Sequence, residues 1–218
     1  MVRTRRKREV QASVKDERLI QKRRDQIING AVALIKDKGY HRMTTREIAK
    51  ASGFSIGTLY EYIRTKEDVL YLVCDRIYDQ VSERLHILMD TELGTVEGLK
   101  TTIAHFFRVM DEMQDEVLIM YQELKSLTKD ALGYVLEKEL LLVELFREML
   151  ERCVENKELK LTEAQMKMAA HNIYVQGQMW CFRRWVLSKM YTLDEYIALQ
   201  TSSFLEGLQA EIKDRSSV

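Results

Sequence analysis

The chain has 218 residues, of which 46% are hydrophobic and 31% charged. This composition is typical of a folded globular protein and excludes a disordered one. Uninterrupted apolar stretches are only a few residues long, such as Leu140–Val143, so we expect no contact with a membrane. The three cysteines, Cys74, Cys153 and Cys181, show no C-x-x-C spacing. They favour buried thiols in a reducing cytoplasm over a disulfide or zinc framework.

The net charge of zero hides an uneven distribution. Residues 1–68 carry 17 Lys/Arg against 9 Asp/Glu, and residues 69–218 carry 17 against 25. A basic first third in an otherwise acidic chain is typical of a protein whose first part meets a polyanion. The alternative is a basic tail alone, since residues 1–24 already hold ten positive charges against three negative ones.

Residues 1–20 show no apolar periodicity and are predicted to form a flexible basic arm. Arg3 and Arg5–Arg8 begin it, and no apolar segment follows them, so we expect no secretory signal. The arm either adds contacts to the minor groove or the phosphates of DNA, as basic arms do elsewhere, or touches nothing.

A helix is predicted from Lys22 to Gly39, because apolar residues recur there every three or four positions. No proline occurs anywhere in the chain, so glycines are the main helix terminators. Thr44 and Glu47 have the spacing of a capping box, and Gly53 ends the short helix that follows. Ser55 is placed to cap a second short helix, Ile56–Ile63. Two short helices around a glycine-containing turn predict a helix-turn-helix.

The rest of the chain is also predicted to be helical. A long helix begins at Thr65, with acidic residues in its first turn. Capping-box spacings recur at Thr162 and Thr192. The expected helices are Thr65–Leu88, Leu99–Met113, Glu116–Lys125, Ala131–Val154, Thr162–Met190 and Thr192–Ile212. The prediction is an all-α fold of about nine helices, with an N-terminal three-helix bundle (21–68) and a larger helical domain (69–218).

The run from Thr44 to Leu70, preceded by Gly39-Tyr40, resembles the signature of the TetR/AcrR family of transcriptional regulators. The resemblance is specific over residues 22–75 and architectural beyond them. The chain departs from the family at Ile56, where many members carry Lys or Arg, and at Ile63, where they carry Phe. Ile56 could contact a thymine methyl group instead of a phosphate.

The resemblance and the small or polar residues at the start of the second motif helix together imply a DNA-reading surface. Packing roles for Tyr60 and Tyr62, and a solvated role for Lys66, stay open as alternatives. The predicted DNA-binding residues are Thr44, Thr45, Arg46, Ser55, Ile56, Gly57, Thr58, Tyr60, Glu61, Tyr62 and Lys66.

The larger domain is rich in methionine and aromatic residues, which suit an apolar ligand pocket but also suit an ordinary core. The resemblance implies a pocket, and Arg183 and Arg184 could receive an anionic group of the ligand. Gly177 indicates a close approach by a ligand or a neighbouring helix. The predicted ligand-binding residues are Phe107, Met110, Met120, Tyr121, Phe146, Met149, Tyr174, Gln178, Cys181, Phe182 and Trp185.

In the family the last two helices form the dimer, here through apolar positions that include Met166, Ala170, Ile173, Val186, Ile197, Phe204 and Leu208. A dimer also suits the two-fold symmetry of an operator. The implied function is a cytoplasmic repressor that binds palindromic operator DNA as a homodimer and is released by a small apolar effector, such as a fatty acyl-CoA. An activator or a corepressor-dependent regulator of the same fold is the alternative.

An enzyme is not expected. The four histidines stand apart, and the sequence holds no H-E-x-x-H, G-x-S-x-G or phosphate-loop motif. No Cys/His cluster has the spacing of metal ligands, so neither a metal nor a cofactor is expected. The sequence does not identify the effector, the operator or the regulated genes, nor does it separate repression from activation.

Overall fold

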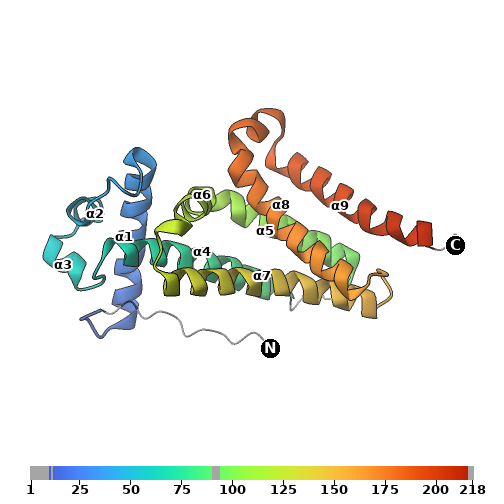
Figure 1. Ribbon diagram of the computed structural model, residues 1–218, viewed down its shortest axis with the longest axis horizontal. Coiled ribbons are helices and arrows are strands. Elements are labelled where there is room, and N and C mark those ends of the chain that lie inside the picture. Colours follow the sequence, from blue (N-terminus) through green and yellow to red (C-terminus); the bar gives the residue numbers. More distant parts are fainter. Residues whose placement is uncertain (1–9, 11, 90–93, 216–218) are drawn as a thin grey trace. The chain divides into compact units, whose positions relative to one another are not determined.

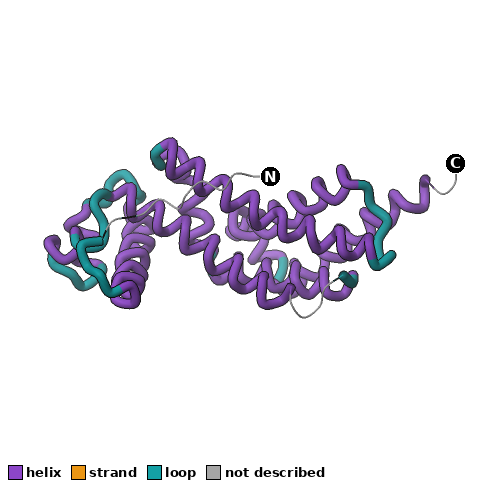
Figure 2. The backbone as a smooth tube through the Cα atoms, turned by 90° about the horizontal axis from the view of Figure 1, so that it is seen from below, coloured by secondary structure: helices purple, strands orange, loops and turns teal. Residues whose placement is uncertain are grey.

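The computed structural model describes residues 10, 12–89 and 94–215, and every regular element in these ranges is a helix (Figures 1 and 2). The all-α prediction is therefore confirmed. None of the described helices combines the length and apolar character needed to cross a bilayer. The helices are α1 (Glu17–Lys38), α2 (Thr45–Ala51), α3 (Ile56–Tyr60), α4 (Lys66–Met89), α5 (Val96–Glu112), α6 (Gln114–Glu123), the 3₁₀ helix η1 (Leu124–Ser126), α7 (Lys129–Glu155), α8 (Glu163–Met190) and α9 (Leu193–Arg215).

The chain divides into two compact units. The first, called the N-terminal unit, comprises residues 1–78 and 115–138, and the second, called the C-terminal unit, comprises residues 79–114 and 139–218. Helices α4 and α7 each contribute residues to both units. The predicted boundary after residue 68 separates a DNA-binding part from a ligand-binding and dimerisation part. This division by function stays a prediction.

Helix α1 begins earlier than predicted. The Asp16 carboxylate accepts hydrogen bonds from the backbone N–H groups of Arg18 (3.0 Å) and Leu19 (3.1 Å), so the helix starts at Glu17. The sequence pattern missed this first turn because the buried stripe of the helix begins only at Ile27. Residues 17–20, predicted to belong to the arm, are thus helical, whereas Arg3 and Arg5–Arg8 lie outside the described residues.

The predicted capping boxes are confirmed. Thr44 accepts from the N–H of Glu47, whose carboxylate accepts in return from the N–H of Thr44. Thr162 and Gln165 make the same reciprocal pair at the start of α8, and Thr192 with Glu195 starts α9. Each pair satisfies two backbone donors that a helix end leaves without an intrahelical partner.

An aromatic core holds the C-terminal unit together. The ring of Phe106 on α5 packs against Phe146 on α7 and Tyr174 on α8, with centroids 5.1 and 5.8 Å apart. At Gly177 an added Cβ would stand 2.4 Å from Cε1 of Phe106. Gly177 therefore permits the close approach of a neighbouring helix, which is one of the two reasons predicted for it.

Candidate DNA interface and effector region

The segment 44–63 forms two short helices on a buried base. Ile48, Ala49, Leu59 and Ile63 are all at most 2% exposed, which anchors α2 and α3 in the N-terminal unit. Between the helices Gly53 has a φ of +75°, a left-handed conformation that a residue with a side chain rarely adopts. Ser55 then caps α3 by accepting from the N–H of Thr58 at 3.0 Å. The predicted helix-turn-helix is confirmed.

The outer side of these two helices is exposed. On α3 and its cap, Ser55, Ile56, Gly57 and Tyr60 reach solvent, and Ile56 and Tyr60 are 38% and 49% exposed. The Tyr60 hydroxyl lies 3.2 Å from Oγ1 of half-buried Thr45, a hydrogen bond that joins the two helices. This surface combines hydroxyl groups, an apolar side chain and close access to backbone, which are the features that a helix needs to meet base edges.

The cations of this surface lie on and just before α2. Arg46 is exposed as predicted, and Arg42 and Lys50, which the prediction omitted, are exposed as well. Successive members of this group are four positions apart in the sequence. This helical spacing of basic residues was the signal by which Arg42 and Lys50 could have been predicted. Exposed arginines and lysines beside a reading helix suit phosphate contacts that set its position.

Tyr62 does not belong to this surface, so its predicted outward position is wrong. Helix α3 ends at Tyr60 instead of continuing to Ile63, and the chain turns inward there. Tyr62 is only 3% exposed and its ring stacks on Phe54 at a centroid distance of 6.4 Å. The packing alternative for this residue is the one that the structure supports.

Lys66 is held inside the N-terminal unit. Its ammonium donates to the backbone carbonyls of Tyr40 (3.2 Å) and His41 (3.3 Å) and lies 4.5 Å from the centre of the Tyr40 ring. Burial, followed by nearby carboxylates such as Glu67, raises the pKa of the Tyr40 hydroxyl far above its usual range. A DNA contact by Lys66 stays a prediction, but its loss would also loosen the link between α4 and the turn before α2.

Thr44 and Glu47 have a structural role at the start of α2. The Lys38 ammonium donates to the Glu47 carboxylate, and the hydroxyl and N–H of Thr44 donate to it as well. These bonds, that from Lys38 first, lower the pKa of Glu47 to about 2. Glu61, the remaining predicted contact, is exposed at the end of α3, while Thr58 is half-buried.

The predicted ligand-binding residues divide between the two units. Met120 and Tyr121 belong to the N-terminal unit, where Met120 is buried and Tyr121 is 60% exposed. The other nine belong to the C-terminal unit. Six of those nine are buried, Gln178 and Phe182 are half-buried, and Trp185 is 64% exposed. The six buried residues are Phe107, Met110, Phe146, Met149, Tyr174 and Cys181.

Packing within the C-terminal unit explains these buried side chains. Phe107 contacts Tyr196 at a centroid distance of 5.7 Å, and the Cys181 thiol donates to the carbonyl of Met110 at 3.2 Å. The core alternative for these six residues is therefore the one that the structure supports. Tyr121 and Trp185 face solvent, and their place in a ligand pocket stays a prediction.

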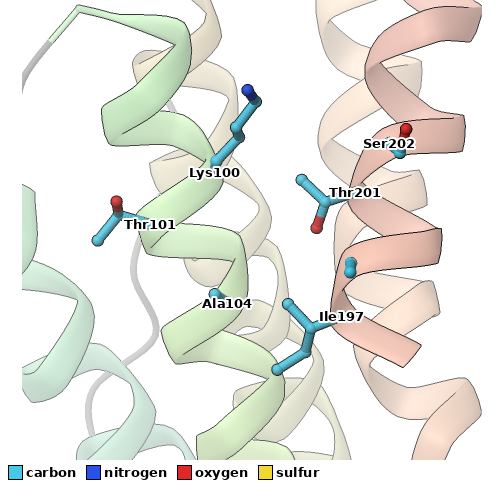
Figure 3. Close-up of a pocket in the computed structure, with 7 residues that line it drawn as sticks. Lys100, Thr101, Ala104, Ile197, Thr201 and Ser202 are labelled. Carbon is cyan, nitrogen blue, oxygen red and sulfur yellow. The ribbon is translucent and has the colours of Figure 1, made fainter. Parts of the chain in front are cut away.

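A cleft of about 440 Å³ opens elsewhere in the C-terminal unit, between α5 and α9 (Figure 3). Lys100, Ala104, Ile197 and Thr201 line it together with Thr101, Ala198 and Ser202. None of the predicted ligand-binding residues is among them. Thr201 is 7% exposed, and its hydroxyl has no hydrogen-bond partner.

Five of the residues expected at the dimer contact are buried within their own chain: Met166, Ala170, Ile173, Ile197 and Phe204. Because they are at most 9% exposed, they cannot supply the contact surface as expected. Among the residues of α8 and α9 whose exposure the structure describes, the large apolar side chains that are exposed are those of Met168, Val175, Trp185, Met190 and Leu199.

A capped pair of short helices on a buried base, with its outer side open and cations beside it, defines a DNA-binding regulator of the helix-turn-helix class. Comparison with known families makes this specific. Residues 27–71 match the family described as "Bacterial regulatory proteins, tetR family". Residues 92–177 match "Tetracyclin repressor-like, C-terminal domain". The chain belongs to the TetR/AcrR family of transcriptional regulators.

Curated relatives agree with this assignment. The HTH-type transcriptional regulator HbdR of Aromatoleum sp. (strain CIB) is 23% identical over 188 residues, which are 86% of this chain and 81% of that protein. The fatty acid metabolism regulator protein of Bacillus subtilis (strain 168) is 30% identical over 101 residues, or 46% of this chain. The match spans about half of the Bacillus protein, 52%.

Solved structures share the fold. AibR in complex with isovaleryl coenzyme A and operator DNA superposes with a TM-score of 0.69 at 19% identity, covering 83% of this chain and 97% of that one. FadR from Bacillus subtilis in complex with stearoyl-CoA gives a TM-score of 0.64 at 24% identity, covering 84% and 96%.

Proposed function

We propose that the protein is a ligand-responsive transcriptional repressor that binds palindromic operator DNA as a homodimer and is released by a small apolar effector, such as a fatty acyl-CoA. The observation that carries the DNA part is the exposed outer side of α2 and α3 above its buried anchor residues. The reading surface that we propose comprises Thr45, Arg46, Ser55, Ile56, Gly57, Thr58, Tyr60 and Glu61, with Arg42 and Lys50 as additional phosphate contacts.

The homodimer would form through the exposed apolar side chains of α8 and α9. Met168 and Val175 lie seven positions apart on α8, so they share a face of that helix. They are 64% and 56% exposed, and Leu199 on α9 is 53% exposed. Exposed large apolar side chains that share one helix face, as Met168 and Val175 do, suit an interaction site. A two-fold dimer would present two reading surfaces to a palindromic site.

Support for an acyl-CoA effector comes from the relatives and from the C-terminal unit itself. Two proteins of the same fold were solved with acyl-coenzyme A compounds. In this chain Arg183 is exposed, its guanidinium lying 5.2 Å from the Trp185 ring, and Arg184 is 3.6 Å from Asp111. Arginines suit the phosphates of coenzyme A. The aromatic core around Phe106 would have to open to admit the acyl chain.

The release mechanism that we propose is a shift between two populations. Helix α4 begins directly after the helix-turn-helix and contributes residues to both units without a break. An effector that favours one position of α4 would move the two reading surfaces of the dimer out of register with successive major grooves.

The experiment is a gel-shift titration with the DNA upstream of the protein's own gene, repeated with acyl-coenzyme A compounds of increasing chain length and with free coenzyme A. Release by the acyl compounds and not by free coenzyme A supports the proposal. Ligand-strengthened binding would support the corepressor or activator alternative, and indifference to every acyl chain length would exclude this effector class.

The reading surface is tested with Arg46→Ala and Lys50→Ala. Each should weaken binding to all sequences alike and lower the salt dependence of the affinity by about one unit of slope for one phosphate contact. An exposed cation of the C-terminal unit, Lys189, provides the matched control, since Lys189→Ala should change neither quantity. If the salt dependence of the affinity is unchanged in both Arg46→Ala and Lys50→Ala, the DNA interface lies elsewhere.

A further inference from the structure

The reading helix carries no cation. From Ser55 to Ile63 the sequence holds no Lys, Arg or His. The side chains that α3 exposes are those of Ile56 (38%) and Tyr60 (49%), beside the bare backbone of Gly57. Guanine in the major groove is most often read by Arg or Lys, which donate to its O6 and N7. Helix α3 has no group of this kind to offer.

The polar groups of α3 are already engaged within the N-terminal unit. The Ser55 and Thr58 hydroxyls lie 3.0 Å apart, and Ser55 also accepts from the N–H of Thr58. The Tyr60 hydroxyl is bonded to Thr45. At the start of the helix Ile56 is therefore the exposed side chain that needs no hydrogen bond. In helix-turn-helix proteins, residues at the start of the second helix contact base edges.

We propose that Ile56 reads the C5-methyl group of a thymine, so that each operator half-site holds an A·T pair at the position under the start of α3. The inference rests on the proposed function, because it assumes that α3 enters the major groove. The thymine methyl is the apolar group that the base pairs present in that groove. Burying Ile56 against it removes apolar surface of both partners from water, whereas a C·G pair has only a hydrogen at C5 and presents an amino group at the neighbouring C4.

The test removes single methyl groups from an operator duplex. Each thymine of one half-site is replaced in turn by deoxyuridine, which lacks only the C5-methyl group. Replacement at one of these positions should weaken binding about fourfold, since burial of one methyl group contributes about 0.8 kcal/mol. Replacing that T·A pair by C·G should weaken binding further, and 5-methylcytosine in place of cytosine should recover about the same factor.

The variant Ile56→Ala assigns the effect to the side chain. It should bind the thymine and deoxyuridine duplexes equally, while Lys50→Ala, the control, should weaken both and keep the fourfold ratio. Ile56→Thr serves as a second variant if Ile56→Ala unfolds, and it should lower the ratio as well. Wild-type protein that binds the operator but ignores every deoxyuridine, or an Ile56→Ala variant that keeps the ratio, overturns the inference. Failure to bind any duplex in low salt instead overturns the proposed function on which it rests.

Discussion

The helix-turn-helix segment and the packed pair of helices α5 and α8 in the C-terminal unit, called the α5–α8 region, differ in what determines their structure. In the first, local groups set the structure: the cap at Thr44, the left-handed Gly53 and the cap at Ser55 each act on the backbone within a few residues. In the second, side chains far apart in the chain do so, as where Phe106 fills the space left by Gly177. Local signals can be read from a sequence, whereas the fit of two distant side chains cannot.

The two regions also differ in what they expose. The helix-turn-helix exposes Ile56 and Tyr60, so the side chains proposed to contact DNA already lie on the surface. The α5–α8 region buries the side chains that were predicted to hold an effector, including Phe107 and Tyr174. A surface for DNA is thus ready before binding, while a site for an apolar effector at these residues would require the core to open.

The largest effect that we expect concerns the thiols. Burial raises the pKa of Cys74 and Cys181 to about 12 and that of Cys153 to about 11. A raised pKa leaves less thiolate at pH 8, and two to three units correspond to a fraction lower by roughly a hundredfold to a thousandfold. Labelling with a disulfide reagent should therefore be at least about a hundredfold slower in the native protein than in the denatured one.

Mass spectrometry of the labelled peptides assigns each rate. Cys181 matters most because it belongs to the predicted effector set. Fast native labelling at Cys181 alone would mean that the C-terminal unit is already open there, and the contrast between a preformed surface and a closed core would be lost. Faster labelling of Cys181 after addition of an acyl-coenzyme A compound would instead show that the effector opens the core, in contrast to the preformed DNA surface.

The next largest effect is expected for Tyr62→Ala. Removal of a buried aromatic ring should lower the free energy of unfolding by about 3–5 kcal/mol. DNA binding should then be lost together with the fold of the N-terminal unit. Denaturant titration followed by circular dichroism measures the stability, and Tyr62→Phe, which keeps the ring on Phe54, should leave it nearly unchanged. Lost DNA affinity at unchanged stability would mean that Tyr62 meets DNA after all.

A smaller effect is expected for Gly177→Ala. The added Cβ would stand 2.4 Å from Phe106, so either the ring of Phe106 or the two helices must shift. Such overpacking should lower the free energy of unfolding by about 1–3 kcal/mol. In the control, Gly207→Ala, nothing lies within 4 Å of the new Cβ on α9, and a gain of about 0.5–1 kcal/mol is expected from the better helix former. Equal effects of the two variants would show that helix propensity, not packing, decides at Gly177.

These contrasts explain what the sequence could predict. The fold class, the helix-turn-helix and three capping boxes were predicted correctly because each depends on periodicity or on residues three positions apart. Tyr62 was misplaced because α3 ends at Tyr60, and no glycine or proline in the sequence marks that end. The expected dimer residues Ala170 and Ile173 were misplaced because an apolar stripe does not say whether its own chain or a second one covers it.

The smallest effect concerns the cap of α2 and its pH dependence. Thr44→Ala removes the hydroxyl that accepts from the N–H of Glu47, and such a loss lowers stability by about 1 kcal/mol. Glu47 has a folded-state pKa of about 2 against an ordinary value of 4.5. A lowered pKa means that the ionised form stabilises the fold. This contribution is fully present above about pH 4.5 and is lost as the pH falls toward 2.

Unfolding midpoints of the wild type and Glu47→Gln, measured from pH 6 to pH 2, should converge as Glu47 takes up its proton, since glutamine keeps a weaker form of the capping box. The matched variant is Glu195→Gln, where the N–H and hydroxyl of Thr192 lower the pKa of the carboxyl in the C-terminal unit. If only Glu47→Gln also weakens DNA binding at neutral pH, the cap of α2 helps to position the reading surface. If both variants weaken it equally, the cap contributes to general stability alone, and the reading surface does not depend on local capping in the way that the comparison of the two regions requires.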